Sequence, residues 1–321
     1  MAHSLLVVGS IAFDTIRTPH GEAADVLGGS ATYFSVAASL YSPVRLVGVV
    51  GDDFPEAHRR VLESRRIDTA GLQVVAGGKT FRWRGSYEGD MNQARTDDVQ
   101  LNVFGDFRPA IPEAWRQTDL VFLANGSPVT QMSVLDQVVR PRLVVADTMN
   151  LWIETARDDL VALLGRIDGL VLNDGEAVML TGERDLARAE ETILGWGPKF
   201  VVIKMGSKGA RVAGRDLRPP AGGRTHALRA VFPAYGKADV RDPTGAGDSF
   251  AGGLMGCLAS QDHEITVDDL QVALEYATVT ASFTIEDFSV RRLDRLAIDE
   301  IDGRLREYHE ALEKSRGAEG G

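Results

Sequence analysis

Cysteine is almost absent from this sequence, and the histidines form no metal-binding pattern. The single cysteine, Cys257, excludes an internal disulfide, and its place inside an apolar helical run favours a buried structural thiol. The six histidines are scattered without the spacing that zinc sites require. A disulfide-stapled scaffold is therefore excluded, and no zinc site is predicted.

Long hydrophobic runs and an excess of positive charge are also missing. The first apolar run, Leu5 to Val8, ends at Gly9 and is too short for a signal or membrane-spanning segment. The 46 acidic residues outnumber the 35 basic ones, and the resulting net charge of −11 repels polyphosphate backbones. We therefore expect a soluble cytoplasmic protein that binds neither membranes nor nucleic acids and holds any nucleotide in a local site.

The sequence does contain the material for a large α/β fold. It has 321 residues, of which 44% are hydrophobic, enough for a sizeable core. Short apolar runs alternate with helical patterns along most of the chain, which is typical of a parallel, doubly wound sheet. Ligands bind such sheets at the carboxyl ends of the strands. Polar residues gather at those predicted ends: Asn125, Asp147, Asn150, Asn173, Glu176, Lys204 and Gly206.

The most informative stretch is residues 241–253, with the sequence RDPTGAGDSFAGG. A turn built on Pro243, Gly245 and Gly247 leads directly into an apolar helical run. The first N–H groups of that helix therefore face outward beside one carboxylate, Asp248. Because glycine lets the backbone approach a phosphate closely, the pattern predicts an anion cradle with a base at its edge. The alternative is an ordinary glycine-rich helix cap in which Asp248 is an N-terminal charge.

Two common nucleotide-binding motifs are excluded by spacing. The dinucleotide fingerprint needs a third glycine three residues after the second, where this chain has Phe250. The P-loop motif is G-x-x-x-x-G-K-[ST]. The only Gly-Lys-Thr sequence of this chain is at 78–80, and Gln73 occupies the position that the first glycine of the motif requires. The glycine-rich turn therefore belongs to neither motif.

Residues 242–253, DPTGAGDSFAGG, closely resemble the C-terminal signature of the PfkB family of ribokinase-like carbohydrate kinases. The resemblance implies a three-layer αβα fold with a doubly wound, mostly parallel sheet and a small β-sheet lid. It also implies transfer of the γ-phosphoryl group of ATP, with Asp248 as general base. The amides of Gly245, Ala246 and Gly247 would form the anion hole. We expect one domain spanning residues 1–321.

The resemblance extends to the side that would bind the phosphoryl acceptor. Asp14 lies where the family binds substrate hydroxyls, although the sequence pattern also allows a solvated edge residue. Gly28 and Gly29 match the family's Gly-Gly-x-x-x-Asn element, whose glycines let the substrate lie against the backbone. Tyr33 replaces the Asn of that element and offers one hydroxyl and a flat apolar face.

Two segments, 11–18 and 79–105, are predicted to form the lid. In the second, Phe81, Trp83 and Tyr87 alternate with charged residues, which is typical of a strand with one dry and one wet face. A polar stretch and a second apolar-alternating run follow, so we expect a hairpin, and the alternative is a decorative edge hairpin. In the family such a clasp is often shared by two subunits, so a homodimer through the lid is a hypothesis.

The family's cation sites also have counterparts. Asn173 and Glu176 resemble its Asn-x-x-Glu motif, which organises Mg²⁺ largely through water, although the same spacing forms a helix capping box. Asp242 and Thr244 lie where relatives often bind a monovalent cation, so K⁺ is a further hypothesis. The expected nucleotide contacts, implied by the family's Lys-x-Gly-x-x-Gly turn and its other motifs, are Asn173, Lys204, Gly206, Gly209, Gly245 and Gly247.

The sequence thus predicts an ATP-dependent kinase acting on a primary hydroxyl of a small sugar or a ribonucleoside. A sugar-phosphate acceptor would need cations, which Arg82 and Arg84 on the lid could supply. A catalytically inactive sensor of the same fold is the other alternative. Residues 298–315 predict a final surface helix, and 316–321 a disordered tail. Four aromatic residues are candidate platforms for a base: Phe13, Tyr33, Trp83 and Trp152.

Overall fold

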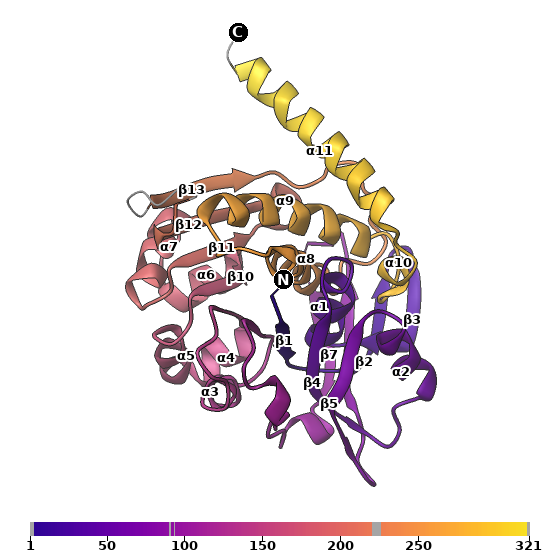
Figure 1. Cartoon of the computed structure of the whole chain (residues 1–321). Coiled ribbons are helices and arrows are strands. Elements are labelled where there is room, and N and C mark those ends of the chain that lie inside the picture. Colours follow the sequence, from indigo (N-terminus) through magenta and orange to yellow (C-terminus); the bar gives the residue numbers. More distant parts are fainter. Residues whose placement is uncertain (1–2, 90, 93, 220–225, 320–321) are drawn as a thin grey trace.

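The computed structural model describes residues 3–89, 91–92, 94–219 and 226–319. Its larger sheet, sheet A, has nine strands in the order β13-β12-β11-β10-β9-β8-β1-β4-β5 (Figure 1). The strands from β11 to β5 run parallel, whereas β12 and β13 are antiparallel to their neighbours. The strands are β1 (Leu5–Val8), β4 (Val44–Gly51), β5 (Ile67–Val75), β8 (Leu120–Leu123), β9 (Leu143–Asp147), β10 (Gly169–Asn173), β11 (Phe200–Lys204), β12 (Ala210–Leu217) and β13 (His226–Phe232).

Sheet A is covered by helices on both faces, which confirms the predicted three-layer αβα fold (Figure 1). In β1, Leu5 and Val7 belong to the core on one side, and Leu6 and Val8 to the core on the other. The first core is covered by α1 (Ser30–Ala38), α2 (Glu56–Glu63), α8 (Ala246–Ser260), α9 (Val267–Thr284), α10 (Arg291–Asp294) and α11 (Ile298–Glu319). The second is covered by α3 (Pro128–Leu135), α4 (Asn150–Thr155), α5 (Arg157–Leu164), α6 (Asp174–Thr181) and α7 (Leu186–Gly195).

A second sheet, sheet B, has the strand order β3-β2-β6-β7. Strands β2 (Ala12–Thr18) and β6 (Phe81–Tyr87) are parallel neighbours, and each forms an antiparallel pair with the strand that follows it, β3 (Gly21–Gly28) or β7 (Ala94–Gln100). The segments predicted for the lid, 11–18 and 79–105, therefore supply β2, β6 and β7. A one-turn 3₁₀ helix, η1 (Asn102–Phe104), leads from β7 back toward sheet A.

The sequence patterns predict neither β3 nor the edge strand β5. Strand β3 is rich in glycine, alanine and acidic residues, which have low strand propensity. Its register also shifts between Asp14 and Ile16 of β2, which interrupts the alternation of buried and exposed side chains. The middle of β5 holds Ala70 and Gly71, and it pairs with only one neighbour.

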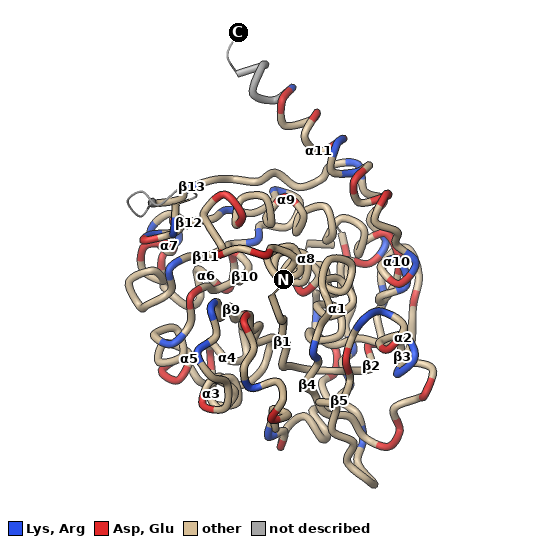
Figure 2. The backbone as a smooth tube through the Cα atoms, in the orientation of Figure 1, with Lys and Arg blue, Asp and Glu red and all other residues tan. Residues whose placement is uncertain are grey.

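The C-terminal helix, predicted over 298–315, is described from Ile298 to Glu319. Residues 320–321 lie outside the described part of the chain. Figure 2 shows acidic and basic residues interleaved along α11. Within the described ranges, no helix is long and apolar enough to cross a membrane.

Candidate active site

The turn before α8 presents the N-terminus of that helix at the carboxyl edge of the sheet. Gly245 caps the helix in the left-handed conformation, with φ of 73°. A Cβ on Gly245 would lie 2.3 Å from the ring of Tyr33, so no larger residue fits there. The amide of Ala246 donates to the carbonyl of Pro243 at 3.2 Å. The predicted anion-hole role therefore rests on the amides of Gly245 and Gly247.

Asp248 lies in the first turn of α8, beside these amides. Burial raises the pKa of its carboxyl to about 6, while the positive charge of Lys204 and its own backbone amide act in the opposite direction. Lys204 ends β11, and its Nζ is 2.6 Å from the position that a Cβ on Gly247 would occupy. The ammonium group thus lies directly against the anion-hole turn, and the carboxyl has a pKa suited to a base near neutral pH.

Asp147 is a second carboxyl at this point, and the sequence prediction did not include it among the site residues. It is the last residue of β9 and is 4% exposed, and its Oδ1 has no hydrogen-bond partner. Burial and the charges of Asp248 and Glu176 raise the pKa of this carboxyl well above its usual range, and Lys204 opposes the shift. An acidic residue at the end of the otherwise apolar strand LVVAD was the available signal.

Asn173 and Glu176 form the capping box that begins α6. The Oδ1 of Asn173 accepts from the Glu176 amide, and the Oε2 of Glu176 accepts from the Asn173 amide, both at 2.8 Å. Glu176 is 8% exposed, and burial raises the pKa of its carboxyl, whereas Lys204 lowers it. The capping and cation-binding interpretations are compatible, because the box uses only one carboxylate oxygen of Glu176.

The turn after β11 is shaped by two glycines with positive φ. Gly206 has φ of 56° and Gly209 has φ of 91°. A Cβ on Gly209 would lie 2.0 Å from the carbonyl oxygen of Phe232 in β13, so this glycine is needed for chain packing. A Cβ on Gly206 would lie 3.1 Å from Oδ1 of Asn92, in the β6–β7 turn of sheet B. The lid therefore reaches across the site to the predicted nucleotide side.

Asp14 faces the site from strand β2 of sheet B. A Cβ on Gly28 would lie 1.9 Å from its Oδ2, so the carboxyl lies directly over that glycine. The Gly29 amide donates to the same carboxyl. Burial, reinforced by Asp242 and Asp248, raises the pKa of Asp14 to about 8. At 4% exposed, Asp14 is not the solvated edge residue that the sequence also allowed.

Tyr33 and Asp242 lie beside the glycine-rich turn. Tyr33 is 1% exposed, and its ring packs against Gly245. Burial and the charges of Asp14, Asp242 and Asp248 raise the pKa of its hydroxyl, so the phenol lies near the carboxyls of the site, and its contact with the acceptor stays a prediction. The carboxylate of Asp242 accepts from the amides of Thr244 at 2.9 Å and Ser289 at 3.4 Å, so it stabilises the turn itself.

The face of sheet B that carries Asp14 is almost free of charge. Strand register places Trp83 beside Asp14 on this face, and Tyr87 follows along the same strand. The hydroxyl of Tyr87 lies 3.2 Å from Oγ1 of Thr244, which joins the lid to the catalytic turn. By register, the described residues on this face are Ala12, Asp14, Ile16, Thr18, Gly21, Ala23, Val26, Gly28, Phe81, Trp83, Gly85, Tyr87, Ala94, Thr96 and Val99, with Asp14 the single charge.

The two arginines predicted to serve a sugar phosphate lie on the opposite face of sheet B. Arg82 pairs with Phe13 in register, and its guanidinium lies 4.7 Å from the centre of that ring. The guanidinium also forms ion pairs with Asp25 and Asp53. Arg84 shares this outer face and is exposed. Neither arginine points toward Asp14.

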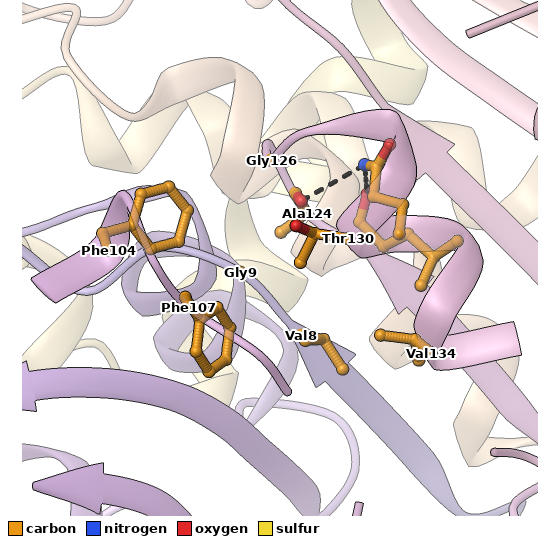
Figure 3. Close-up of a pocket in the computed structure, with 10 residues that line it drawn as sticks. Val8, Gly9, Phe104, Phe107, Ala124, Gly126, Thr130 and Val134 are labelled. Atoms are coloured by element: carbon orange, nitrogen blue, oxygen red, sulfur yellow. Dashed lines mark hydrogen bonds between the residues drawn. The ribbon is translucent and has the colours of Figure 1, made fainter. Parts of the chain in front are cut away.

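An apolar pocket lies beside the site, at the carboxyl ends of β1 and β8. Phe104 and Phe107 lie on one side of it, and Thr130 and Val134 on the other (Figure 3). Phe104 also stacks on Phe81 of the lid, with ring centres 5.4 Å apart. No titratable side chain lines this pocket, so Asp248, Lys204 and the other charged residues of the site are not part of it.

Within the described residues, no group of three or more histidine, cysteine, aspartate or glutamate side chains is arranged to hold a metal ion alone. The acidic side chains that converge are Asp147, Glu176 and Asp248, all influenced by the single positive charge of Lys204. Carboxylate oxygens are the ligands that Mg²⁺ prefers, and it usually keeps several waters. The buried, unpartnered Oδ1 of Asp147 fits such a cation.

Comparisons with known proteins identify relatives of this chain. Residues 129–294 match the model of the pfkB family carbohydrate kinases. A cytidine kinase of Thermococcus kodakarensis is 30% identical over 257 residues, which cover 78% of this chain and 87% of that protein. An ATP-dependent ribose-1-phosphate kinase of Halopiger xanaduensis is 27% identical, over 80% of this chain and 79% of that one.

A solved structure shows the same fold. The nucleoside kinase of Methanocaldococcus jannaschii, described as a member of the ribokinase family, superposes with a TM-score of 0.74. The match covers 95% of this chain and 99% of that one, at 19% sequence identity. The chain therefore belongs to the pfkB family of carbohydrate kinases and is a sugar or nucleoside kinase with the ribokinase fold.

Proposed function

We propose that this protein transfers the γ-phosphoryl group of ATP to a primary hydroxyl of a ribonucleoside. The observation that carries the proposal is the convergence of Asp248, Lys204 and Asp14 on the turn at the N-terminus of α8. The arrangement combines a base, a cation and an anion-binding helix terminus, which are the parts that phosphoryl transfer needs.

Each of these residues has a defined role in the proposed reaction. Asp14 accepts hydrogen bonds from acceptor hydroxyls and so places the reacting hydroxyl near Asp248. Asp248 accepts the proton of that hydroxyl as its oxygen attacks the γ-phosphorus and the bond to the β-phosphate oxygen breaks. The amide of Gly247 and the ammonium of Lys204 stabilise the negative charge that develops on the phosphoryl oxygens. The products are ADP and the phosphorylated acceptor.

Magnesium fits the carboxylates beside Lys204. Glu176 and Asp147 would hold the ion, in large part through water, next to the nucleotide phosphates. When bound, Mg²⁺ neutralises charge on the β- and γ-phosphates. A monovalent cation at Asp242 and Thr244 stays a hypothesis, and an increase in turnover when K⁺ replaces tetramethylammonium would support it.

The acceptor is proposed to be uncharged. Among the described residues, the face of sheet B that carries Asp14 has no cation to bind a phosphate, because Arg82 and Arg84 lie on the other face. This disfavours a sugar phosphate, although one relative is a ribose-1-phosphate kinase. It agrees with the relative that is a cytidine kinase. An inactive sensor is disfavoured because it would not need a base such as Asp248.

The acceptor proposal is tested by ATP consumption with magnesium across ribonucleosides, free sugars and sugar monophosphates. We expect the largest kcat/KM with ribonucleosides and slower turnover of free ribose. Phosphorus NMR of the product should show a phosphate ester at the 5′ position. A clear preference for a sugar monophosphate would contradict the proposal.

We also propose a homodimer that forms through sheet B. Strand β7 is the edge of this sheet, all of its residues are exposed, and Val99 is 45% exposed. Unpaired edge strands with exposed apolar side chains favour pairing with another chain. Light scattering should give the mass of a dimer, and charged substitutions such as Val99→Lys should shift it toward the monomer. A monomeric mass of the unmodified protein at micromolar concentration would overturn this proposal.

A further inference from the structure

We propose that Gln131 is a positioning residue that fixes the carboxyl of Asp147 at the edge of the candidate site. The assignment rests on the proposed function, in which Asp147 helps to hold magnesium. Gln131 belongs to α3 and is 3% exposed. Its Nε2 donates to the backbone carbonyls of Leu123 at 2.9 Å, Ala124 at 3.3 Å and Asp147 at 3.1 Å, and Figure 3 draws the bond to Ala124. One carboxamide therefore joins the carboxyl ends of β8 and β9.

Gln131 continues the link between two strands beyond their last register pair. Strands β8 and β9 pair in register only as far as Ala146, so the next residue, Asp147, has no register partner in β8. On its other side, Asp147 still pairs with Val171 of β10. Gln131 thus takes the place of a strand neighbour on the β8 side. Without it, the backbone of Asp147 would be held in sheet A from the β10 side only.

The surroundings of Gln131 require a hydrogen-bond donor at this position. All three groups bonded to Nε2 are carbonyl oxygens, which only accept hydrogen bonds, so the amide nitrogen and not the amide oxygen must face them. A side chain of the same size without a donor cannot join the two strand ends. Because buried carbonyl groups that lose a hydrogen bond are costly, removal of the donor favours a rearrangement of these ends.

The carboxyl of Asp147 depends on this support. The residue is 4% exposed, and its Oδ1 has no hydrogen-bond partner. The charges that act on it are those of two other carboxyls, Glu176 and Asp248, and of Lys204. The position of the carboxyl is therefore set by its backbone, which Gln131 and β10 hold from two sides. Residues that orient metal-binding side chains affect metal affinity without touching the ion.

Gln131→Met tests this assignment, because methionine fills a similar volume and has no donor. Gln137→Met is the matched control. Gln137 follows the end of α3, and its Nε2 donates to the carbonyls of Pro109 and Ser133, both at 2.9 Å, neither of which belongs to sheet A. Both substitutions remove the same type of hydrogen bond, but only the first affects Asp147. Thermal melting confirms that each variant is folded, and Gln131→Leu replaces Gln131→Met if that variant is not.

We expect the affinity for Mn²⁺ to fall about 10- to 100-fold in Gln131→Met, the range for residues that orient metal ligands. It is measured by electron paramagnetic resonance with an unreactive ATP analogue bound. The magnesium concentration for half-maximal turnover should rise by a similar factor, while KM for the acceptor stays within about twofold. Gln137→Met should match the wild type in all three measurements. In a double-mutant cycle with Asp147→Asn, the effects on Mn²⁺ affinity should not add.

The failure of this assignment and that of the proposed function are distinguishable. Weaker Mn²⁺ binding in Asp147→Asn, with unchanged binding in Gln131→Met, would overturn the role of Gln131 and leave that of Asp147 intact. Equal losses in Gln131→Met and Gln137→Met, or strictly additive effects in the cycle, would also overturn the role of Gln131. Unchanged Mn²⁺ binding in Asp147→Asn would overturn the proposed metal-binding role of Asp147 and this assignment together.

Discussion

The charges in the candidate site depend on whether a few buried carboxyls are protonated. Asp14, Asp147 and Asp248 all have a pKa above the usual range, because burial disfavours their charged forms. Lys204 is the cation that opposes this shift at both Asp147 and Asp248. In the proposed mechanism the charge of Lys204 therefore acts both on the base, Asp248, and on the phosphoryl oxygens.

The pH dependence of catalysis follows from Asp248. A base must be ionised, and the pKa of Asp248 is about 6, so kcat/KM for the acceptor should rise through about pH 6, with a further rise near pH 8 where Asp14, which is proposed to bind the acceptor, ionises. Lys204→Met removes the charge that lowers this pKa, so the midpoint of the residual activity should move to higher pH. A wild-type profile with its midpoint near pH 4, or no shift in Lys204→Met, would contradict the assignment of the base.

Some residues of the site are predictable from sequence, and others are not. The turn with Gly245 and Asp248 is local, so its geometry follows from a short run of residues. The role of Tyr33 is not local, because it depends on Gly245, more than 200 residues away, packing against its ring. The sequence places Asp147 at a strand end, but its position beside Asp248 and Lys204 is evident only in the folded chain.

The elements of the lid are joined to the catalytic turn by hydrogen bonds. Thr18 in β2 donates to the carbonyl of Arg241 at 2.9 Å, and Tyr87 in β6 contacts Thr244 at 3.2 Å. Ser289, which donates to Asp242, also contacts the carbonyl of Leu27 at the end of β3. The lid and the turn are therefore linked at three strands, through the side chains of Thr18 and Tyr87 and the backbone carbonyl of Leu27.

Tyr87→Phe tests this link, because it removes only the hydroxyl that contacts Thr244. We expect kcat/KM for the acceptor to fall about 2- to 10-fold, the effect of one net hydrogen bond, with little change in the melting temperature. In a double-mutant cycle with Thr244→Val, the two effects should not add, since both variants lose the same contact.

Tyr235→Phe is the matched control for this experiment. The hydroxyl of Tyr235 contacts Glu307 at an exposed position, so its loss should leave kcat/KM unchanged. Strictly additive losses in Tyr87→Phe and Thr244→Val would show that the two residues act independently and that the lid is not coupled to the turn by this contact.

Strands are predictable from the sequence where nearly all of their side chains are buried. The apolar runs of β1, β8 and β11 are buried on both faces and were recognised. Strand β3 has a register shift and few strand-forming residues, so its pattern alone does not distinguish it from a loop. Strand β6 is recognisable by alternation, but its parallel pairing with β2 is a long-range contact. Strand β7 lies in the polar stretch that the sequence predicts as the connection, and the second predicted strand, Val99 to Val103, continues beyond β7 into η1.

The whole molecule brings distant segments together at the carboxyl edge of sheet A. The proposed base, Asp248, comes from α8, Lys204 from β11, the carboxyls proposed to hold magnesium from β9 and α6, and Asp14 from sheet B. The lid crosses from Asp14 to Asn92 beside Gly206, so it covers both the acceptor and the nucleotide sides. The family resemblance predicts this organisation, whereas composition and periodicity alone predict only a parallel sheet with ligands at one edge.

The most direct test of the whole account is the single-site variant Asp248→Asn, assayed with ATP, magnesium and the best nucleoside. We expect kcat to fall at least about 100-fold, the range for loss of a general base, while the dissociation constant for ATP stays within about threefold. Asp262→Asn is the control, since this exposed aspartate follows the far end of the same helix. Loss of turnover in Asp248→Asn alone, with the fold and ATP binding retained, is the predicted result. Near-normal turnover in Asp248→Asn would contradict the proposed mechanism.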